Sequence, residues 1–437
     1  MNKLDSAPSF LADAERFLMP EEKTLLSPKS NTTTFADNMK LPVHRWYRYS
    51  AGYSAEWAGS LMEHWGAKNV LDPFGGSGTT VLAAQEKGIN SFAVDVHPFV
   101  AKIAKAKLAW DIDLDIFIDK YKKIIKEYQL RKVISTPTSP LAHKCFPDEY
   151  ILVELLKIRD CVLELDQDND VSKLLWLAFV GIIRPSSPAG TAQWQYVLPN
   201  KTKKKVIEPL IAFKTNCENF VSDIKARKKL IGNYSSTSKF IETDARILQG
   251  VPDEWADAII TSPPYANNYD YADATRFEQI MLGEIDGWSD LKSLRKNLLR
   301  SATQNLSGWK AETVLSSSEL SPIIEEFIPV WDELQEVRKT KGGNKPYHAM
   351  LAGYFYDNAL VFNALRKKSK EGVKVCYVVG DSAPYGVHAP VEKWLGKLAL
   401  AAGFKSWSFT KVRDRNTKWK NRKHQHPLHE GYLWIEG

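Results

Sequence analysis

The stretch KNVLDPFGGSGTTVLAAQEKG, residues 68 to 88, gives the clearest indication of the fold of this chain. The stretch begins with a strand pattern, KNVLDPF, which ends in the glycine-rich turn GGSGTT. The run TTVLAAQEKG that follows reads as a helix, and Gly88 stands just past its end, where glycine commonly closes a helix. A second strand, INSFAVDV, and a second helix, HPFVAKIAKAKLAW, repeat the unit. This alternation predicts the start of a doubly wound α/β sheet.

The other strands of this sheet are expected later in the chain. Strand patterns recur in KFIET (239–243), WADAIIT (255–261) and VKVCYVVG, and then near SWSFTKV and GYLWIEG. Helical patterns run from 347 to 368 and from Val391 to Ala401. We therefore predict a Rossmann-like, doubly wound sheet of seven strands.

Two segments interrupt this pattern. Residues 111–238 are rich in helical patterns and are predicted to form an inserted helical domain. A second interruption, a loop insertion at about 286–345, contains KTKGGNK, which is typical of a mobile loop. The predicted organisation is completed by an irregular segment (1–40), a first part of the main domain (41–110) and a second part (239–437).

Composition bounds the class of protein. The chain has 437 residues, which favours two domains or one domain with large insertions. Hydrophobic residues make up 44% and charged residues 25%, as in ordinary globular proteins. The N-terminal residues lack the apolar core of a signal peptide. The apolar run LLWLAFVGII (174–183) is too short to span a bilayer and predicts a buried helix. We expect a cytoplasmic protein without membrane contact.

The cysteines predict neither a zinc site nor a disulfide framework. Cys145, Cys161, Cys217 and Cys376 are far apart and form no CxxC pair. We expect them to serve as small apolar residues, and we expect no metal site.

Positive charge is clustered along the chain. The net charge is +7, and three runs are strongly basic: KTKKK (201–205), KARKK (225–229) and KVRDRNTKWKNRK (411–423). Such runs are often only solvated faces. Aromatic residues lie near or within them, however, and this interleaving favours a polyanionic partner.

The glycine-rich turn favours one ligand class over two others. It lacks the lysine of a phosphate-binding P-loop, and the third glycine of a dinucleotide-binding turn would fall at Val81. Asp95 ends the next strand, where a carboxylate can accept hydrogen bonds from both hydroxyls of a ribose. Gly76 and Gly78 would let a ligand lie against the backbone, and Asp72 is placed to bind a cationic amino group. A ribose, an ammonium group and no phosphate match S-adenosylmethionine.

A second motif, ITSPPY (260–265), follows the apolar run ADAI (256–259). Proline has no N–H and a fixed φ, so two consecutive prolines end the strand in a stiff turn. This turn is either a plain loop or a rigid tip that holds a functional group, and its setting favours the rigid tip.

DPFGGSGTT followed by TSPPY resembles the amino-methyltransferases that modify exocyclic nitrogens of DNA bases. The resemblance covers roughly residues 44–110, 239–283 and 345–437. It implies a class I methyltransferase fold, S-adenosylmethionine as cofactor and double-stranded DNA as substrate. The order of the motifs is similar to the class whose target-recognition domain lies between them, so the resemblance assigns that role to 111–238.

The resemblance also implies roles for individual residues. HRWYRYSAGYSAEW (44–57) is similar to the family's cofactor-contacting segment, in which Gly52 and Tyr53 match. Asp244, after the third strand, matches the position that binds the adenine of the cofactor, and GDSAPYGVHAP (380–390) is similar to the segment after the fifth strand. The expected cofactor-binding residues are Tyr53, Asp72, Phe74, Gly76, Gly78, Thr79, Asp95 and Asp244.

The SPPY tetrad is expected to catalyse methyl transfer. An exocyclic amine is a poor nucleophile because its lone pair is delocalised into the ring. The Ser262 hydroxyl and the Pro263 carbonyl can accept hydrogen bonds from the NH₂ group and restore the lone pair, while Pro263 and Pro264 keep the turn rigid. Tyr265 can stack on the base, which must leave the duplex. The reaction is then a direct displacement that depends on alignment.

The first residue of the tetrad bears on the substrate. By resemblance, SPPY is typical of cytosine-N4 enzymes, whereas DPPY or NPPY is commoner in adenine-N6 enzymes. We expect cytosine N4, with adenine N6 as the alternative. An RNA amino-methyltransferase and a non-catalytic nucleic-acid-binding module are further alternatives. The missing glycine disfavours a nicotinamide oxidoreductase.

KTKKK and KVRDRNTKWKNRK are expected to contact DNA phosphates, which all DNA sequences share. Lys→Ala changes there should therefore weaken binding to all sequences alike. The expected contact residues are Lys201, Lys203, Lys204, Lys205, Arg413, Arg415, Lys418 and Lys420. A restriction endonuclease that recognises the same DNA sequence is a candidate partner.

Overall fold

A computed structural model describes residues 35–49, 52–166, 168–192, 195–232, 235–415 and 426–437. Within them, seven strands form one sheet in the order β5-β2-β1-β6-β7-β9-β8. The strands are β1 (Asn69–Asp72), β2 (Asn90–Asp95), β5 (Ser238–Glu242), β6 (Ala256–Thr261), β7 (Ser369–Gly380), β8 (Ser406–Arg415) and β9 (Leu428–Glu436). The first five are parallel, and β9 is antiparallel to both β7 and β8. The predicted seven-stranded sheet is confirmed, and it is consistent with a class I methyltransferase.

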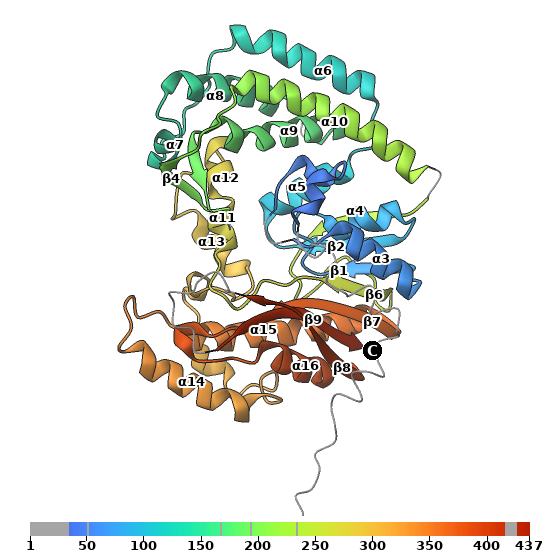
Figure 1. Ribbon diagram of the computed structural model, residues 1–437, viewed down its shortest axis with the longest axis vertical. Coiled ribbons are helices and arrows are strands. Elements are labelled where there is room, and N and C mark those ends of the chain that lie inside the picture. Colours follow the sequence, from blue (N-terminus) through green and yellow to red (C-terminus); the bar gives the residue numbers. More distant parts are fainter. Residues whose placement is uncertain (1–34, 50–51, 167, 193–194, 233–234, 416–425) are drawn as a thin grey trace, which may run out of the picture.

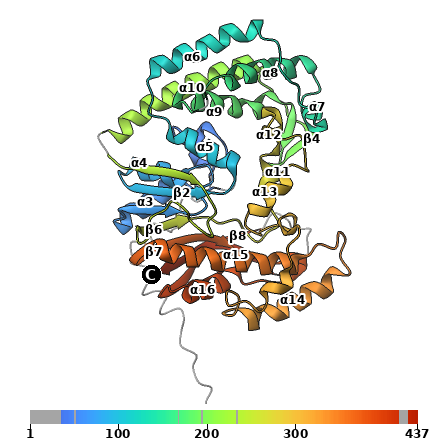
Figure 2. The ribbon, with the colours of Figure 1, turned by 180° about the vertical axis from the view of Figure 1, so that it is seen from behind.

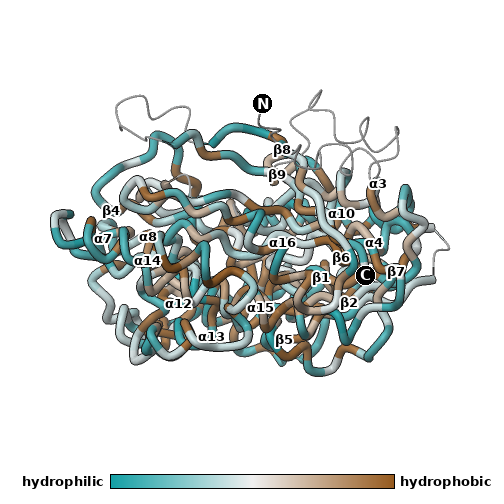
Figure 3. Tube along the Cα trace, turned by 90° about the horizontal axis from the view of Figure 1, so that it is seen from below, coloured by the Kyte–Doolittle hydropathy of each residue, from teal (hydrophilic) through white to brown (hydrophobic). Residues whose placement is uncertain are grey.

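Helices cover both faces of the sheet (Figures 1 and 2). One face carries α3 (Ala55–Trp65), α4 (Thr79–Glu86) and α5 (Pro98–Leu108), and the other carries α15 (Tyr347–Lys368) and α16 (Val391–Ala401). Neighbouring strand residues serve opposite faces: Val70 packs with α3, whereas Leu71 belongs to the cluster of α15 and α16. Because both faces are covered, the central strands are nearly continuous apolar runs. Figure 3 shows hydrophobic stretches in the middle of the molecule around α15 and α16, and hydrophilic stretches such as α7 at its edge.

Residues 111–238 form a helical layer at the end of the molecule away from α14 and α16 (Figure 1). The helices are α6 (Leu114–Glu127), η3 (Tyr128–Leu130), α7 (Pro140–Cys145), α8 (Glu149–Leu163), α9 (Asp170–Ser186) and α10 (Pro209–Ile231). A two-stranded antiparallel ribbon, β3 (Ala189–Thr191) and β4 (Val197–Thr202), lies between α9 and α10 in sequence. The apolar run predicted to be a buried helix is the body of α9.

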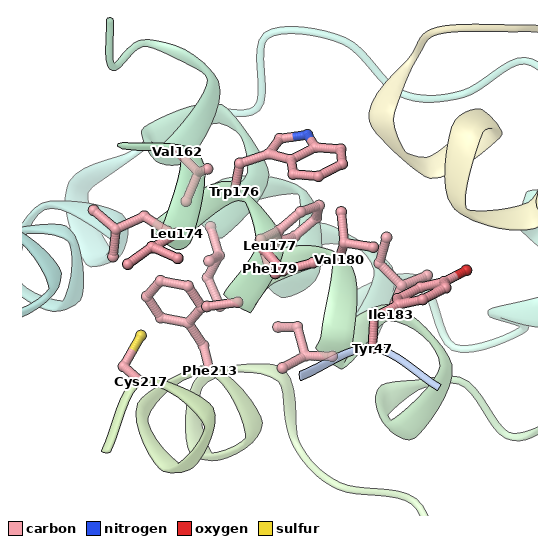
Figure 4. Packing of buried hydrophobic residues seen from close by; sticks show 14 of the residues in the cluster. Tyr47, Val162, Leu174, Trp176, Leu177, Phe179, Val180, Ile183, Phe213 and Cys217 are labelled. Atoms are coloured by element: carbon pink, nitrogen blue, oxygen red, sulfur yellow. The ribbon is translucent and has the colours of Figure 1, made fainter. Parts of the chain in front are cut away.

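The core of this layer extends beyond it. Phe179 of α9 and Phe213 of α10 are fully buried in its centre, and Tyr47 packs at its border (Figure 4). Phe99 of α5 and Phe277 of α12 (Arg276–Leu282) belong to the same cluster. The helical layer therefore shares its hydrophobic core with helices outside 111–238, and its status as a separate inserted domain stays a prediction.

The segment expected to be a loop insertion at about 286–345 is largely helical. It follows the short helices α11 (Tyr271–Ala274) and α12, and it contains α13 (Leu291–Asn297), η4 (Thr303–Leu306), η5 (Ala311–Val314) and α14 (Ile324–Arg338). Phe327, Trp331 and Leu334 are spaced by four and three residues and pack into the cluster under α15. The stretch 339–345, KTKGGNK, lacks helix and strand, as do the connections 298–302, 307–310 and 315–323 between these helices.

Several smaller features complete the fold. Short 3₁₀ turns are η1 (Asp37–Lys40), η2 (His44–Trp46) and η6 (Pro384–Gly386). All four cysteines are buried free thiols, which confirms their predicted use as apolar residues. Among the described residues, no helix combines the length and the apolar character that crossing a membrane requires.

Candidate active site at the carboxyl edge of the sheet

A pocket lies at the carboxyl edge of the sheet, where β1, β2, β5 and β6 end. The chain proceeds from β1 to one side and from β6 to the other, and open α/β sheets bind ligands at such a reversal of strand order. Six predicted residues line the pocket: Phe74, Gly76, Asp95, Asp244, Ser262 and Pro264. The expected cofactor-binding positions and the expected catalytic turn thus share one pocket.

The glycine-rich turn brings its backbone against this pocket. Gly76 has a φ of 49°, and its N–H donates to the Asp95 carboxylate at 3.0 Å. A Cβ at this position would lie 3.0 Å from the ring of Tyr49, so no side chain fits without a shift. Gly78, with a φ of 87°, caps the N-terminus of α4, and Thr79 begins that helix. These constraints explain the glycines of the motif.

Asp95 ends β2 at the pocket wall. One carboxylate oxygen accepts the N–H of His97 at 2.9 Å, and the other accepts the N–H of Gly76 at 3.0 Å. Burial raises the pKa of Asp95 to about 6, against the lowering effect of these two N–H groups. Two backbone donors fix the orientation of the carboxylate, and an ionised carboxylate has acceptor capacity for two further donors.

Asp72 lies behind the pocket wall and is 2% exposed. Its carboxylate accepts hydrogen bonds from the Phe74 N–H at 3.0 Å, Thr261 Oγ1 at 2.6 Å, Thr80 Oγ1 at 2.5 Å and the Tyr53 hydroxyl at 3.1 Å. Burial raises its pKa. These contacts join the glycine-rich turn, α4 and β6. Asp72 and Tyr53 therefore support the pocket wall, and their direct contact with a cofactor stays a prediction.

Asp244 lines the pocket as part of a charged network. Its carboxylate accepts from Nε of Arg246 at 2.9 Å and from Nη2 at 2.6 Å. Nη1 of Arg246 donates to Asp357 of α15 at 2.9 Å, and Asp357 also binds the backbone N–H of Arg300 at 2.9 Å. Burial disfavours the charged form of Arg246, but the hydrogen bonds and charges of Asp244 and Asp357 outweigh burial and raise its pKa. The network closes the pocket beside residues 297–299.

The SPPY turn follows β6 directly. Ser262 and Pro264 line the pocket, whereas Pro263 is buried and, like Tyr265, is not part of the lining. Burial raises the pKa of Tyr265 well above its usual value, and the side chain of Ser262 opposes this shift. The tyrosine therefore stays neutral. Stacking of Tyr265 on a base stays a prediction.

Further tyrosines lie between the turn and the ribbon. Tyr271 lines the pocket, and its ring meets that of Tyr269 edge-on at 4.6 Å. Tyr269 lies 5.2 Å from Tyr196, whose hydroxyl accepts the N–H of Asp270 at 2.8 Å. The start of β4 is thus tied to the segment that follows SPPY.

The residues expected to contact phosphates differ in their surroundings. Lys201, Lys204 and Lys205 are exposed on β4 and just after it. Lys203 is partly buried and donates to the carbonyl of Arg184, and burial lowers its pKa. Arg413 pairs with Glu430 at 2.6 Å, and Arg415 lies over the ring of Tyr265. Lys418 and Lys420 lie outside the described residues.

Tyr49, from the predicted cofactor-contacting segment 44–57, also lines the pocket. The pocket further contains residues that the sequence did not single out: His97, Arg246, Tyr271, Asn297, Leu298, Leu299 and Val361. Arg246 and Tyr271 follow predicted residues closely, so their proximity to the motifs was a usable signal. Residues 297–299 and Val361 come from distant segments, and no pattern in the sequence marks them.

Comparisons with known proteins find relatives among the type II methyltransferases. No protein-family model matches the chain. The chain is 26% identical over 420 residues to the type II methyltransferase M.BsoBI of Geobacillus stearothermophilus, covering 85% of this chain and 80% of the relative. It is 25% identical to the type II methyltransferase M.AvaI of Nostoc sp., covering 85% and 81%. M.MvaI of Kocuria varians, also a type II methyltransferase, is 22% identical and covers 65% of both chains. These homologues support a methyltransferase and hence an enzyme.

Proposed function

We propose that the chain is a site-specific DNA methyltransferase that transfers a methyl group from S-adenosylmethionine to the exocyclic N4 of cytosine in double-stranded DNA. One observation carries the proposal: Ser262 and Pro264 of the SPPY turn line the same pocket as Asp95, Gly76 and Asp244. A methyl donor and an amine acceptor must meet in one place, and this pocket holds the residues expected for each. The type II methyltransferase names of the relatives support a role in restriction–modification.

The residues of the pocket fit S-adenosylmethionine. The Asp95 carboxylate is oriented for the two ribose hydroxyls, and the backbone of Gly76 lines the pocket beside it. Nδ1 of His97, which is 2% exposed and lines the pocket, has no hydrogen-bond partner among the described residues. Asp244 would bind the adenine from the Arg246 network. When bound, the cofactor supplies an activated methyl group, and the pocket offers no lysine-bearing phosphate loop that would suit a nucleotide instead.

The catalytic contribution of the protein is to prepare the amine. The Ser262 hydroxyl and the Pro263 carbonyl would accept hydrogen bonds from the target NH₂ group and favour tetrahedral geometry at the nitrogen. The turn is rigid because two prolines fix its backbone. The target base must leave the helix to reach this pocket, and an aromatic ring beside the turn is suited to stack on it.

DNA is the substrate that the surface charge favours. Lys201, Lys204 and Lys205 form an exposed basic edge on the ribbon, whose other end is tied to the SPPY segment through Tyr196 and Asp270. A two-stranded ribbon is also an element that the major groove of DNA admits. We propose residues 111–238 as the target-recognition region, and an endonuclease with the same recognition sequence as the partner of the enzyme.

The first test measures methyl transfer directly. Purified protein is incubated with methyl-labelled S-adenosylmethionine and either DNA or RNA, and the products are digested to nucleosides for mass spectrometry. The proposal predicts N4-methylcytosine in DNA. N6-methyladenine would support the adenine alternative, and label in RNA alone would support an RNA amino-methyltransferase. Binding of DNA without any transfer of label would support a non-catalytic module.

A further inference from the structure

Arg415 is the last residue of β8, and its side chain lies over the catalytic turn rather than in solvent. The centre of its guanidinium is 5.2 Å from the centroid of the Tyr265 ring, a cation–π geometry. Its Nη1 donates to the carbonyl of Asp381 at 3.0 Å, in the segment that follows β7. The guanidinium thus connects three strand ends: those of β6, β7 and β8.

Gly380 at the end of β7 makes room for this arrangement. A Cβ at Gly380 would lie 2.5 Å from Nη1 of Arg415 and 3.2 Å from its Cδ. Gly380 is required here because Arg415 approaches its backbone closely, and not because of an unusual backbone angle. The segment after β7 is also tied to the turn by Ser382, whose hydroxyl donates to the carbonyl of Ala266.

The contact with Tyr265 places a cation over the aromatic ring of the tetrad. The charge of Arg415 is among the influences on the Tyr265 hydroxyl and on that of Tyr271, a pocket residue. A side chain that holds the Tyr265 ring therefore holds part of the turn that carries Ser262.

Arg413, two residues earlier on β8, shows what a surface position on this strand looks like. It pairs with Glu430 at 2.6 Å, and 43% of its side chain is exposed. Arg415 differs because its guanidinium is already engaged by a carbonyl and an aromatic ring. A phosphate contact would require that guanidinium to leave both partners.

We propose that Arg415 is a positioning residue of the catalytic turn, which fixes the ring of Tyr265 next to the Ser262 and Pro263 acceptors proposed for the target amine. This inference rests on the proposed function and deepens it. It also replaces the sequence-based expectation that Arg415 contacts a phosphate.

The test begins with two substitutions. Arg415→Met keeps an aliphatic chain but removes the charge and the donors, and Arg415→Lys keeps the charge but not the planar guanidinium. With saturating DNA and S-adenosylmethionine, the single-turnover rate of Arg415→Met should fall by about 10- to 100-fold, the scale of a small misalignment. Arg415→Lys should recover part of the rate. Calorimetry should find unchanged affinity for S-adenosylhomocysteine in both.

Salt dependence separates positioning from phosphate binding. Loss of one phosphate contact makes the slope of log affinity against log salt shallower by about one unit. Arg415→Met should keep the slope of the parent, whereas Arg413→Met serves as the reference for loss of a surface cation on β8. A shallower slope with an unchanged single-turnover rate in Arg415→Met would overturn the proposal.

A double variant tests whether Arg415 acts through Tyr265. In a Tyr265→Ala background, Arg415→Met should lower the single-turnover rate little further, because the ring that it holds is gone. Multiplicative losses in the double variant would place the action of Arg415 elsewhere and contradict the proposal. If a variant fails to fold, Arg415→Lys replaces Arg415→Met and Tyr265→Leu, which also lacks the ring, replaces Tyr265→Ala.

Arg366 provides the matched control. It is also a partly buried arginine that donates to a backbone carbonyl beside β7, but at Ser369, the opposite end of the strand. Arg366→Met should leave the single-turnover rate unchanged, and an equal loss there would reduce the effect of Arg415 to general strand packing. If the parent protein methylates no DNA in the same assay, the proposed function fails. If the parent is active and Arg415→Met matches it, only the positioning role fails.

Discussion

At the scale of single residues, Asp95 combines two properties that govern cofactor binding. Two backbone N–H groups hold its carboxylate at the pocket, and burial raises its pKa to about 6. The ionised carboxylate can accept from both ribose hydroxyls, whereas the protonated form loses part of this capacity. Affinity for S-adenosylhomocysteine should therefore be full above about pH 6 and fall as the pH drops below that value.

Asp95→Asn tests this expectation by calorimetry between pH 5 and pH 8. At pH 8 the variant should bind more weakly by about 1.5–3 kcal/mol, and its affinity should lose the pH dependence of the parent. Stability is the control. A pKa raised from 3.8 to about 6 favours folding only at low pH, and that contribution is lost as the pH rises through 6. The free energy of unfolding at pH 8 is measured beside the affinity, because the Asn amide keeps only one acceptor oxygen for the two backbone N–H groups. If Asp95→Asn keeps the affinity and the pH profile of the parent, Asp95 does not bind the cofactor.

Ser262→Ala tests the catalytic turn. Both prolines remain, so the variant should fold and bind S-adenosylhomocysteine normally. The single-turnover rate should fall by on the order of 10²–10³, the scale for one preorganised polar partner. Tyr265→Ala should act on the base instead, and 2-aminopurine at the target position should report less of the flipped state. Full turnover by Ser262→Ala would leave the Pro263 carbonyl as the acceptor.

The sequence predicted the motif residues of the pocket but not their partners. Asp95 and Gly76 were recognisable because a strand end and a glycine-rich turn have local signatures. Arg246, which pairs with Asp244, also pairs with Asp357 of α15, more than a hundred residues away in sequence. A basic run such as the one around Arg415 gives no sign of which side chains turn inward.

At the scale of elements, periodicity predicted all seven strands of the sheet and the helices at 79–86, 98–108, 347–368 and 391–401. In the segment 286–345, for which the sequence predicts a loop insertion, the structure has α13, η4, η5 and α14, joined by irregular stretches. In the sequence, its core residues, such as Phe327 and Trp331, can be recognised only from their helical spacing. The joint core of 111–238 with α5 and α12 depends on tertiary packing, which periodicity does not reveal.

The basic ribbon gives an element-scale prediction with its own control. Lys201→Ala, Lys204→Ala and Lys205→Ala should each weaken binding to all DNA sequences alike and make the salt slope shallower by about one unit. Lys203→Ala should leave the slope unchanged, because Lys203 donates to the carbonyl of Arg184 and is partly buried. If all four variants keep the salt slope of the parent, the ribbon is only a solvated face and does not contact phosphates.

At the scale of the whole molecule, the helical layer and the sheet should unfold together because they share a core. Trp176 of α9 is fully buried, and its ring lies 5.8 Å from that of Phe99 on α5. Trp176→Ala should lower the free energy of unfolding by about 3–5 kcal/mol. Trp288→Ala is the matched control, since Trp288 is 49% exposed and should cost far less. Two separate transitions by circular dichroism and tryptophan fluorescence would show that the layer folds independently.

The central claim is that this chain methylates cytosine N4 in DNA through the SPPY turn. Its most direct test is modified-base sequencing of DNA from a host that lacks N4-methylcytosine and expresses either the parent chain or Ser262→Ala. The parent should place N4-methylcytosine at one short recognition sequence, and Ser262→Ala should leave most of those sites unmodified. DNA without any new methylated base, or with N6-methyladenine in place of N4-methylcytosine, would contradict the claim.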